Sequence, residues 1–454
     1  MERGVGVRSP WIEQLRRDAT PRPLAADTAT DVAVIGAGIA GASTAFFVLE
    51  RTDLSVVLIE RGQLARGATG HNAGQLTTEF ERPLRSLVAT YGFEMAMEAQ
   101  RTIEDSWDLL DEMVQRCAAR VRVDRFVGHM AMFTLDHVCV HLESSALRRR
   151  AGMFVPACLV SETAPFLADI PAEFDGLFEV VPPSRIGELI GPTDARYCAV
   201  LCEMKGCANG ALLVEQVIDD LLRRFPDRFT FVDHTPVTHV ALERDTAVVA
   251  AGGHTVTTSR VVLCTNGFRD HVVDNLVGDD IGLHLHHRVR GTVGYMAGYV
   301  EDTASEPRAT SYIRNEVIGG AIPYAYLTRR AHDAKSGLGT LNCIGGPEDK
   351  LADIARYDPS ADVPASVIHE IDDELLPIVR PRRPAGLPYD YAWHGVMGYT
   401  ATGVRLIGAE PRNPVLLYNL GCNGVGFLPS IAGGDRIARL LRGEHLAPSI
   451  FDPP

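Results

Sequence analysis

The first strongly patterned stretch of the chain is a short apolar run that leads directly into glycines. Asp31–Ile35 predicts a buried strand, and residues 36–41 read Gly-Ala-Gly-Ile-Ala-Gly. An apolar helix carrying Phe46 and Leu49 follows, and Val56–Ile59 predicts a second buried strand. Strand, glycine turn, helix and strand together form a βαβ unit, the arrangement that is typical of a dinucleotide-binding domain.

Helical and strand patterns alternate along the rest of the chain. Apolar residues recur at helical spacing after Pro83, at Ile103, Trp107, Leu110 and Val114, and again over Ala211–Arg223 and at Ile431, Ile437 and Leu441. Strands are expected at Phe229–Val232, Ala247–Ala250, Val261–Cys264, Val289–Met296, Ser311–Val317, Thr340–Ile344 and Val415–Leu420. The first thirty residues are expected to form an irregular arm, because Pro10, Pro21 and Pro23 should break any helix there.

Length and charge narrow the function classes. A chain of 454 residues is long enough for two domains, and its net charge of −14 disfavours binding to nucleic acid phosphates. No apolar run is long enough for a membrane helix, and residues 1–30 lack the apolar core of a secretory signal. The nine cysteines are scattered, so we expect reduced thiols and a cytoplasmic protein. His284, His286 and His287 lack a partnering acid or cysteine cluster, so we predict no metal site.

The glycine turn has the spacing that a dinucleotide requires. Gly36 permits a tight turn, Gly38 lets the backbone approach a pyrophosphate, and Gly41 lets the helix pack closely on the strand. Glu60 closes the second strand, where an acidic side chain can bind ribose hydroxyls. The alternative is a glycine-rich turn that binds no nucleotide. The complete βαβ context favours the dinucleotide.

Three later features favour FAD over NAD. Arg61 is followed by the small-residue loop 67–74, which reads Gly-Ala-Thr-Gly-His-Asn-Ala-Gly and is suited to lie against a flat ring. The predicted strand 261–264 ends in Thr265-Asn266-Gly267 and would return the chain to the nucleotide. The segment 420–426 places Gly421, Gly424 and Gly426 in a turn before the last helix, where backbone N–H groups can face an anionic ligand.

Together these segments resemble the D-amino-acid oxidase superfamily of flavoproteins, in the branch that contains glycine oxidase, sarcosine oxidase, dimethylglycine dehydrogenase and γ-glutamylputrescine oxidoreductase. The resemblance covers about residues 30–445. It implies an α/β + β fold, with a Rossmann-type FAD-binding domain and an antiparallel-sheet substrate domain. We assign residues 1–30 to the arm, 31–82, 205–275 and 385–445 to the FAD-binding domain, and 83–204 and 276–384 to the substrate domain.

The resemblance also implies a set of cofactor-binding residues and a reaction. The cofactor residues expected from it are Gly36, Gly38, Gly41, Glu60, Arg61, Thr69, His71, Asn72, Ala73, Thr265, Gly267, Gly421, Gly424 and Gly426. The reaction it implies is oxidation of a C–N bond in a small amine or amino acid, by hydride transfer to flavin N5, which gives an imine. Oxygen or another acceptor would reoxidise the flavin. No catalytic side chain can be assigned, and the candidates are Tyr312, Tyr324 and Arg290.

One position departs from the family pattern. Members that bind an amino-acid carboxylate often show Trp-x-Gly-x-Arg near the C-terminus, whereas this chain has Met397 in the arginine position after Trp393 and Gly395. A methionine cannot form the bidentate pair that arginine makes with a carboxylate. We therefore predict that amines are better substrates than simple α-amino acids, unless Arg290 or Arg405 supplies a cation from elsewhere. The departure also leaves open a biosynthetic flavoprotein with an unusual or carrier-bound substrate, or a protein that uses FAD only structurally.

His71 has two readings. Dimethylglycine dehydrogenase-like members carry a histidine at the matching place that is joined to the 8α carbon of the flavin, and His71 could form the same bond. The alternative is a packing or hydrogen-bonding contact near the ring. Both readings place His71 in contact with the flavin.

Overall fold

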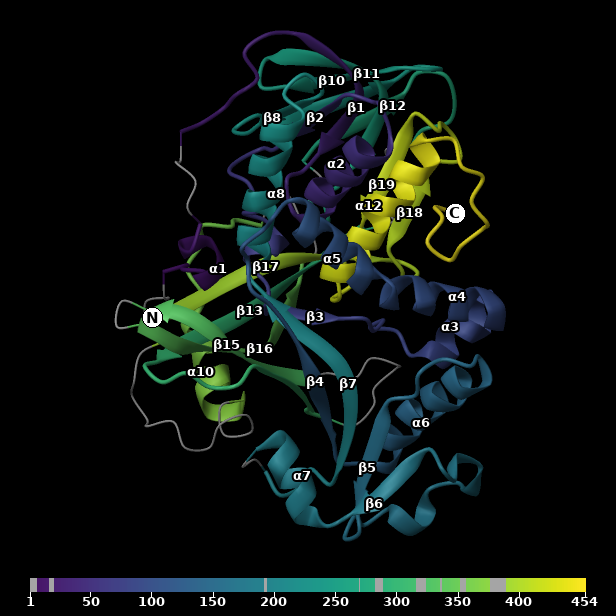
Figure 1. Cartoon of the computed structure of the whole chain (residues 1–454), viewed down its shortest axis with the longest axis vertical. Helices are drawn as coiled ribbons and strands as arrows, with labels where there is room; N and C mark the ends of the chain where they lie inside the picture. The colour runs from purple at the N-terminus through teal and green to yellow at the C-terminus, as the bar shows by residue number, and fades with distance from the viewer. Residues whose placement is uncertain are drawn as a thin grey trace.

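The computed structural model describes residues 6–15, 20–191, 194–268, 270–281, 289–315, 324–334, 337–351, 357–375 and 389–454. Two large β-sheets make up its frame, one in the upper and one in the lower half of Figure 1. The chain crosses between them several times, so segments far apart in the sequence lie side by side. Among the described helices, none is long and apolar enough to cross a membrane.

The upper sheet contains nine strands within the described residues, and its centre is parallel. The order is β12-β9-β10-β11-β1-β2-β8, with β19 joined to β11 and β18 joined to β19. Its parallel pairs are β1 with β2 and β11, β2 with β8, β11 with β19, and β9 with β12. The strands are β1 (Thr28–Ile35), β2 (Val56–Ile59), β8 (Phe229–Val232), β9 (Val237–Leu242), β10 (Ala247–Ala251), β11 (His254–Leu263), β12 (Val272–Asn275), β18 (Leu406–Ala409) and β19 (Leu416–Leu420).

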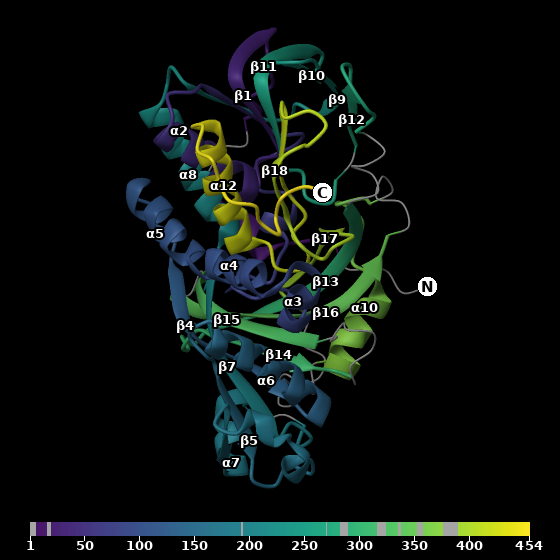
Figure 2. The ribbon, with the colours of Figure 1, turned by 90° about the vertical axis from the view of Figure 1, so that its right-hand side faces the viewer.

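Three helices cover one face of this sheet (Figure 2). They are α2 (Ile39–Arg51), α8 (Gly210–Arg224) and α12 (Phe427–Leu441). Residues 39–49 of α2 are all buried, because the helix lies between the sheet and α12 rather than at the surface. At Gly434 of α12, an added Cβ would lie 2.7 Å from the backbone of Ser43, so this glycine permits the close approach of the two helices.

The lower sheet contains ten strands within the described residues. Its order is β17-β13-β16-β15-β14-β4-β7-β5-β6, with β3 paired to β7. Most neighbours are antiparallel, and the exceptions are β14 with β4 and β5 with β6. The strands are β3 (Gln75–Thr77), β4 (Val123–Met132), β5 (Ala157–Ser161), β6 (Phe178–Val181), β7 (Ala199–Ala208), β13 (Val289–Glu301), β14 (Arg308–Ile313), β15 (Tyr324–Ala334), β16 (Gly337–Lys350) and β17 (Tyr391–Thr400).

The remaining helices lie between the sheets or at the edges of the lower one. In Figure 1, α3 (Leu84–Tyr91), α4 (Phe93–Glu104) and α5 (Ser106–Arg116) run across the middle of the molecule. The helices α6 (Leu135–Arg150) and α7 (Pro183–Ile190) flank β5 and β6 at the lower end, and α10 (Ala365–Glu370) lies beside β16. The helical pattern after Pro83 is thus divided among several helices, with α4 and α5 separated at Asp105.

The expectation that prolines break any helix in the first thirty residues is wrong. Pro10 begins the short helix α1 (Pro10–Glu13), where its missing N–H costs no hydrogen bond, and the Ser9 hydroxyl caps the helix by accepting from the Trp11 N–H. Trp11 is fully buried. Strand β1 also begins at Thr28, before the predicted start at Asp31.

Several predicted strands prove longer in the structure, and others were not predicted. Strand β11 begins at His254 rather than Val261, and β13 and β16 extend well beyond 289–296 and 340–344. The predicted strand 311–317 is β14, which ends at Ile313, and its last two positions lie outside the described residues. The strands that were not predicted are β3, β4, β5, β6, β7, β9, β12, β15, β17 and β18. His284, His286 and His287 lie outside the described residues.

Candidate active site

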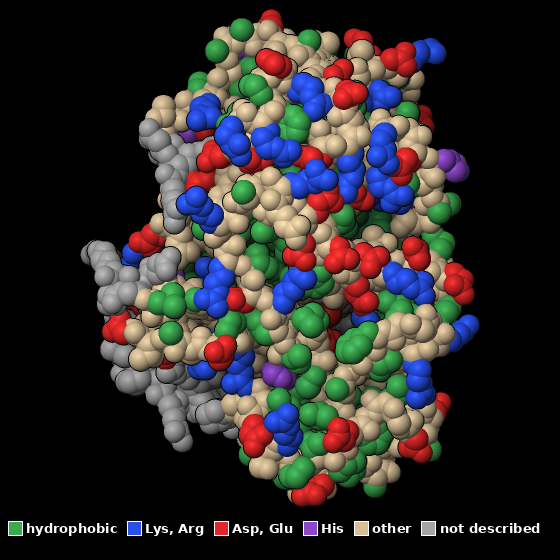
Figure 3. All heavy atoms as spheres, viewed as in Figure 1, with side chains coloured by type: hydrophobic (Ala, Val, Ile, Leu, Met, Phe, Trp, Pro, Cys, Tyr) green, Lys and Arg blue, Asp and Glu red, His purple; other side chains and the backbone are tan. Residues whose placement is uncertain are grey.

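A cavity of about 580 Å³ lies between the two sheets. Figure 3 shows a hollow near the middle of one face, with acidic side chains around it. The βαβ turn, the loop after β2 and the turn before α12 form one part of the cavity wall. Strands β7, β13, β15, β16 and β17 of the lower sheet form much of the opposite wall, and residues of α6 and of the segment after β3 complete it. A volume of this size is typical of a cofactor or small-molecule site.

The turn after β1 requires glycine at Gly36 and Gly41. Gly36 has φ +105°, and an added Cβ would lie 2.8 Å from the Cys264 carbonyl oxygen of the neighbouring strand end. An added Cβ at Gly41 would overlap the Gly36 carbonyl. Helix α2 begins at Ile39 with Gly38 as its N-cap, so no side chain of Gly38 covers the positive end of the helix. Gly36 and Gly38 line the cavity, whereas Gly41 packs behind them.

Glu60 and Thr69 hold the turn in place. The Glu60 carboxylate accepts from the Ala37 N–H at 2.9 Å and from the Gly62 N–H at 3.0 Å. Burial raises the pKa of Glu60 above its ordinary value. The Thr69 hydroxyl accepts from the Ile39 N–H at 2.9 Å, which joins the small-residue loop to the start of α2. Both side chains line the cavity.

The loop 67–74 carries His71, Asn72 and Ala73 along the cavity wall. The His71 Nδ1 lies 3.1 Å from the Gly67 carbonyl oxygen, so Nδ1–H is the donor and Nε2 keeps the lone pair. Burial lowers the pKa of His71 to about 4, so the ring is neutral near pH 7. The Asn72 amide donates to the Ala68 and Thr69 carbonyls at 3.1 and 2.7 Å, which closes the loop on itself.

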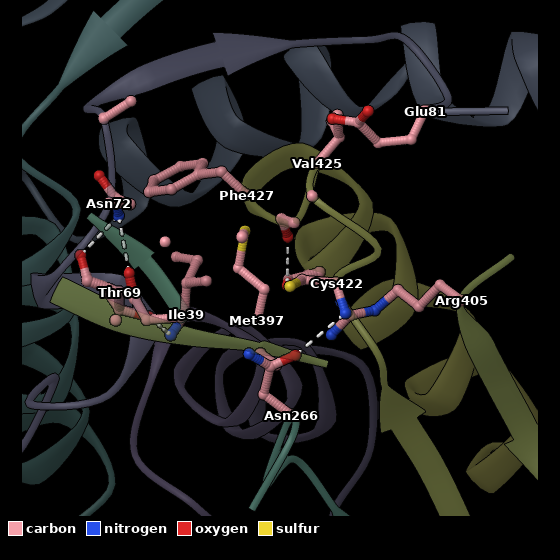
Figure 4. A pocket seen from close by; sticks show the side chains of 18 of the residues that line it. Ile39, Thr69, Asn72, Glu81, Asn266, Met397, Arg405, Cys422, Val425 and Phe427 are labelled. Atoms are coloured by element: carbon pink, nitrogen blue, oxygen red, sulfur yellow. Dashed lines mark hydrogen bonds between the residues drawn. The ribbon is translucent and has the colours of Figure 1, made fainter. Parts of the chain in front are cut away.

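Asn266 connects three segments at the centre of the cavity wall (Figure 4). Its carbonyl oxygen accepts from the Cys422 N–H at 3.0 Å and from the Gly398 N–H at 3.3 Å. Its amide donates to the Val396 carbonyl at 3.1 Å. Asn266 therefore ties the end of β11 to β17 and to the turn before α12. Sequence reasoning named its neighbours Thr265 and Gly267 but missed Asn266 itself.

The other predicted cofactor residues divide into two groups. Arg61, Thr265, Gly424 and Gly426 line the cavity, and Arg61 is also paired with Asp270. Gly267 and Gly421 do not line it. Gly267 packs against Gly398 of β17, where an added Cβ would lie 2.7 Å from the Gly267 backbone nitrogen. Gly421 has φ +83° and packs against Thr400. These two glycines therefore shape the wall from behind.

The catalytic candidates lie in different places. Tyr324 lines the cavity. Tyr312 is buried in the core, where its hydroxyl donates to the Ile190 carbonyl at 2.7 Å, and it does not line the cavity. The exposed Arg290 side chain donates to the Val289 carbonyl at 3.2 Å and does not line the cavity either.

Met397 projects into the cavity from β17, between the loop of Asn72 and the turn of Cys422 (Figure 4). An added Cβ at Gly294 of β13 would lie 3.0 Å from the Met397 Cε, so the methionine lies over this glycine.

Arg405 is fixed by Asn419, to whose side-chain and backbone oxygens it donates at 2.7 and 2.9 Å. It also lies 3.5 Å from the Gly421 carbonyl oxygen, so its guanidinium supports the glycine turn.

Sequence reasoning missed the acidic residues of the cavity wall. Glu79 and Glu81 follow β3, Glu203 lies on β7 and Glu348 on β16, and all four line the cavity. A signal was present in the first pair, because Glu79 and Glu81 continue the two-residue spacing of Gln75 and Thr77 on β3, and all four line the cavity. Phe80 and Arg82 line it as well, so the alternation does not extend past the strand as a strict pattern. Pattern alone did not show that this face is an inner wall.

One lysine lies among these carboxylates. Lys205 of β7 is 2 % exposed, and its Nζ lies 3.6 Å from Glu79 Oε1 and 3.9 Å from Glu203 Oε2. Burial is the largest single influence on Glu79 and raises its pKa, but the charge of Lys205 and the hydrogen bonds with Glu203 and Thr77 together outweigh it and lower the pKa to about 2. The pKa of Glu203 is raised instead, by burial and by the neighbouring Glu79.

The sequence pattern of the family described as FAD dependent oxidoreductase matches residues 31–440. Among curated relatives, the chain is 28 % identical over 110 residues to the probable oxidoreductase OrdL of Haemophilus influenzae, and 29 % identical over 86 residues to the γ-glutamylputrescine oxidoreductase of Escherichia coli. These matches cover 24 % and 19 % of this chain and 25 % and 20 % of the relatives.

Solved structures show the same fold over nearly the whole chain. Glycine oxidase from Geobacillus kaustophilus has a TM-score of 0.66 at 15 % identity, covering 93 % of this chain and 98 % of its own. L-Proline dehydrogenase from P. horikoshii has a TM-score of 0.67 at 15 % identity, covering 94 % and 97 %. At these identities the likeness concerns the fold alone.

Proposed function

This chain belongs to the FAD dependent oxidoreductase family, and we propose that it oxidises a C–N bond of a small amine to an imine. The names of γ-glutamylputrescine oxidoreductase, glycine oxidase and L-proline dehydrogenase among its relatives and structural neighbours support an amine or amino-acid substrate. FAD is the cofactor of the family.

The residues present fit a dinucleotide. The Gly36 and Gly38 turn carries no side chain that would block a pyrophosphate, and the N-terminus of α2 behind it favours an anion. Glu60 lines the cavity next to this turn, where its carboxylate can accept from ribose hydroxyls. We propose that these residues hold the adenosine and pyrophosphate, and that the loop of Thr69, His71 and Asn72 and the turn of Gly424 and Gly426 hold the flavin.

When bound, FAD supplies the hydride acceptor for the reaction. The task of the protein is to bind and orient the amine, to exclude water and to leave the amine nitrogen unprotonated. The lower sheet provides a wall for this purpose, because β13, β15, β16 and β17 contribute Met296, Tyr324, Tyr326, Glu348 and Met397 to the cavity.

The observation that carries the substrate class is the group of carboxylates on one part of the cavity wall, together with Met397. Glu79, Glu81, Glu203 and Glu348 all line the cavity, and Lys205 among them is already paired with two of these carboxylates. A substrate carboxylate would meet acidic neighbours and would find the thioether of Met397 in place of an arginine. An ammonium or neutral amine suits this wall better.

The experiment is an anaerobic screen for flavin reduction. Purified protein reconstituted with FAD would be mixed without oxygen with primary amines, secondary amines and the corresponding α-amino acids, and the flavin absorbance would be followed. We expect amines to reduce the flavin faster than the matched amino acids. Faster reduction by glycine or D-alanine would refute the amine preference, and failure of every compound would favour a specialised substrate or a structural role for FAD.

A further inference from the structure

We propose that the carboxylate of Glu81 is the proton acceptor of this active site, which removes the proton from the substrate ammonium before C–N oxidation. The inference rests on the proposed amine oxidation and adds a catalytic residue to it. The step is a proton transfer, in which the N–H bond of the substrate ammonium breaks and an O–H bond forms on Glu81. The products are a neutral amine and a neutral carboxylic acid, so charge and atoms balance without a further reactant.

The position of Glu81 supports this role. It lies between β3 and α3 and lines the cavity at the end of the alternating polar series 75–81. An added Cβ at Gly424 would lie 2.5 Å from Glu81 Oε1, so the carboxylate packs directly against the turn before α12. Figure 4 shows Glu81 beside Val425 of this turn, on the opposite side of the cavity from Asn72.

Tyr324 orients the carboxylate. Its hydroxyl donates to Glu81 Oε1 at 2.7 Å from strand β15, which leaves Oε2 as the oxygen that can accept from a substrate. A single fixed hydrogen bond of this kind holds an acid–base group in place while leaving one oxygen for the reaction. The predicted candidate Tyr324 thus acts as a positioning residue, through Glu81.

The charged groups around Glu81 act on its pKa in both directions. Burial is the largest influence on the pKa of Glu81 and raises it. The hydrogen bond from Tyr324 acts in the opposite direction and lowers this pKa. The negative charges of Glu348 and Glu79 raise it, and the positive charge of Lys205 lowers it. The net result is a pKa of about 7. Tyr326 and Tyr399 are uncharged neighbours near pH 7, because burial keeps the pKa of each phenol well above 10.

The raised pKa makes the Glu81 carboxylate a stronger base than an ordinary glutamate, and removal of a proton from an ammonium requires a strong base. An alkyl ammonium has a pKa of about 10, so transfer to an ordinary glutamate with a pKa of about 4.3 is opposed by more than five orders of magnitude. For a carboxylate with a pKa of about 7, the equilibrium constant of this proton transfer is unfavourable by only about three orders of magnitude. Such a group is also largely ionised at pH 8, which a base must be to accept a proton.

The first experiment measures anaerobic flavin reduction by a saturating amine between pH 6 and pH 10. We expect the wild-type rate to fall below a pKa near 7, as Glu81 becomes protonated. We expect Glu81→Gln to be slower by 100-fold or more at pH 8, and to recover towards pH 10 as the solution supplies neutral amine directly. The exposed Glu162→Gln is a matched control that should leave the profile unchanged. A residue that only binds the cation would affect KM and would show no recovery at high pH.

Two further variants keep the test valid if Glu81→Gln folds poorly. Tyr324→Phe removes a hydrogen bond that lowers the pKa of Glu81, so the acid limb should move to higher pH. Glu348→Gln removes a charge that raises this pKa, so the limb should move to lower pH. Shifts of opposite sign would support the assignment to Glu81. An acid limb that moves in neither variant, or that persists in Glu81→Gln, would overturn it.

A binding measurement provides a readout that does not depend on turnover. tert-Butylamine has no hydrogen on the carbon that bears its nitrogen, so it cannot be oxidised by hydride loss. Between pH 7 and pH 10 its Kd for the wild-type holoenzyme should be constant, because ionised Glu81 takes the proton of the bound ammonium. In Glu81→Gln, which can bind only the neutral amine, the Kd should fall about tenfold per pH unit over the same range. Equal pH profiles in the two proteins would refute the role of Glu81. If no amine reduces the wild-type flavin at all, the proposed function fails first, and the role of Glu81 falls with it.

Discussion

Trp11 and Trp393 meet edge to face, with ring centroids 6.4 Å apart, and their indole N–H groups donate to the same oxygen, the carbonyl of Asn72, at 2.7 and 3.2 Å. Trp11 comes from the N-terminal segment and Trp393 from β17. Together they hold the loop 67–74 from outside the cavity, and the Trp11 ring fills the space beside Gly74. The N-terminal segment therefore supports the loop that we propose to face the flavin.

This relationship predicts that Trp11 stabilises both the fold and the cofactor site. Trp11→Ala should lower the free energy of unfolding by about 3–5 kcal/mol, because it removes a large, fully buried ring. Trp11→Phe keeps most of the packing and should cost about 1 kcal/mol for the lost hydrogen bond. Urea unfolding and retained flavin would be measured for both. Equal stability of wild type and Trp11→Ala would contradict the prediction.

Gly38→Val should abolish FAD binding. A β-branched side chain there would crowd the Thr69 hydroxyl, which lies 2.9 Å from the position of an added Cβ, and would occupy the approach to the N-terminus of α2. Retained flavin should fall at least about tenfold in purified protein. Gly187→Val is the matched control, since Gly187 is exposed and an added Cβ meets nothing within 4 Å. Full flavin content in Gly38→Val would argue against a pyrophosphate at this turn.

His71→Ala should weaken flavin retention. The imidazole is neutral near pH 7 and its Nδ1–H is used by the Gly67 carbonyl, so Nε2 is the atom left to contact or attack an electrophile. Acid precipitation of wild-type protein separates the two readings of this residue. A yellow precipitate that becomes colourless in His71→Ala indicates a covalent link, and release of all flavin to the supernatant excludes one. A crystal structure with FAD that placed His71 far from the ring would refute both.

Met397→Arg should increase affinity for carboxylates. The change restores the residue type that the family pattern places here, and arginine binds a carboxylate through two parallel hydrogen bonds. An amine and the amino acid that differs from it only by a carboxylate would be compared by stopped-flow reduction. The ratio of kcat/KM should move towards the amino acid by about tenfold or more. Met397→Leu is the control for volume, and the prediction fails if leucine and arginine have the same effect.

The sequence by itself determined the local part of the site. Residues 31–60 predicted the βαβ unit nearly to its bounds, because the glycine turn, the helix and the two strands depend on conformational preferences and contacts between near neighbours. Glycine is needed at positions 36, 38 and 41 because a side chain would meet neighbouring atoms there, and the residue type at each position is read directly from the sequence. The departure at Met397 was equally visible, since it needs only the residue type.

The tertiary structure decided the remainder of the cavity. Glu81 meets Tyr324 and Gly424, and Asn266 meets Cys422, only because two sheets pair strands that are far apart in the sequence. The buried position of Trp11 also depends on Trp393 and Gly74 being in place. An alternating run such as Gln75, Thr77, Glu79 and Glu81 shows that one face is polar, but solvent and an inner cavity favour the same pattern. Which of the two it faces is set by long-range packing, and this packing also raises the pKa of Glu81.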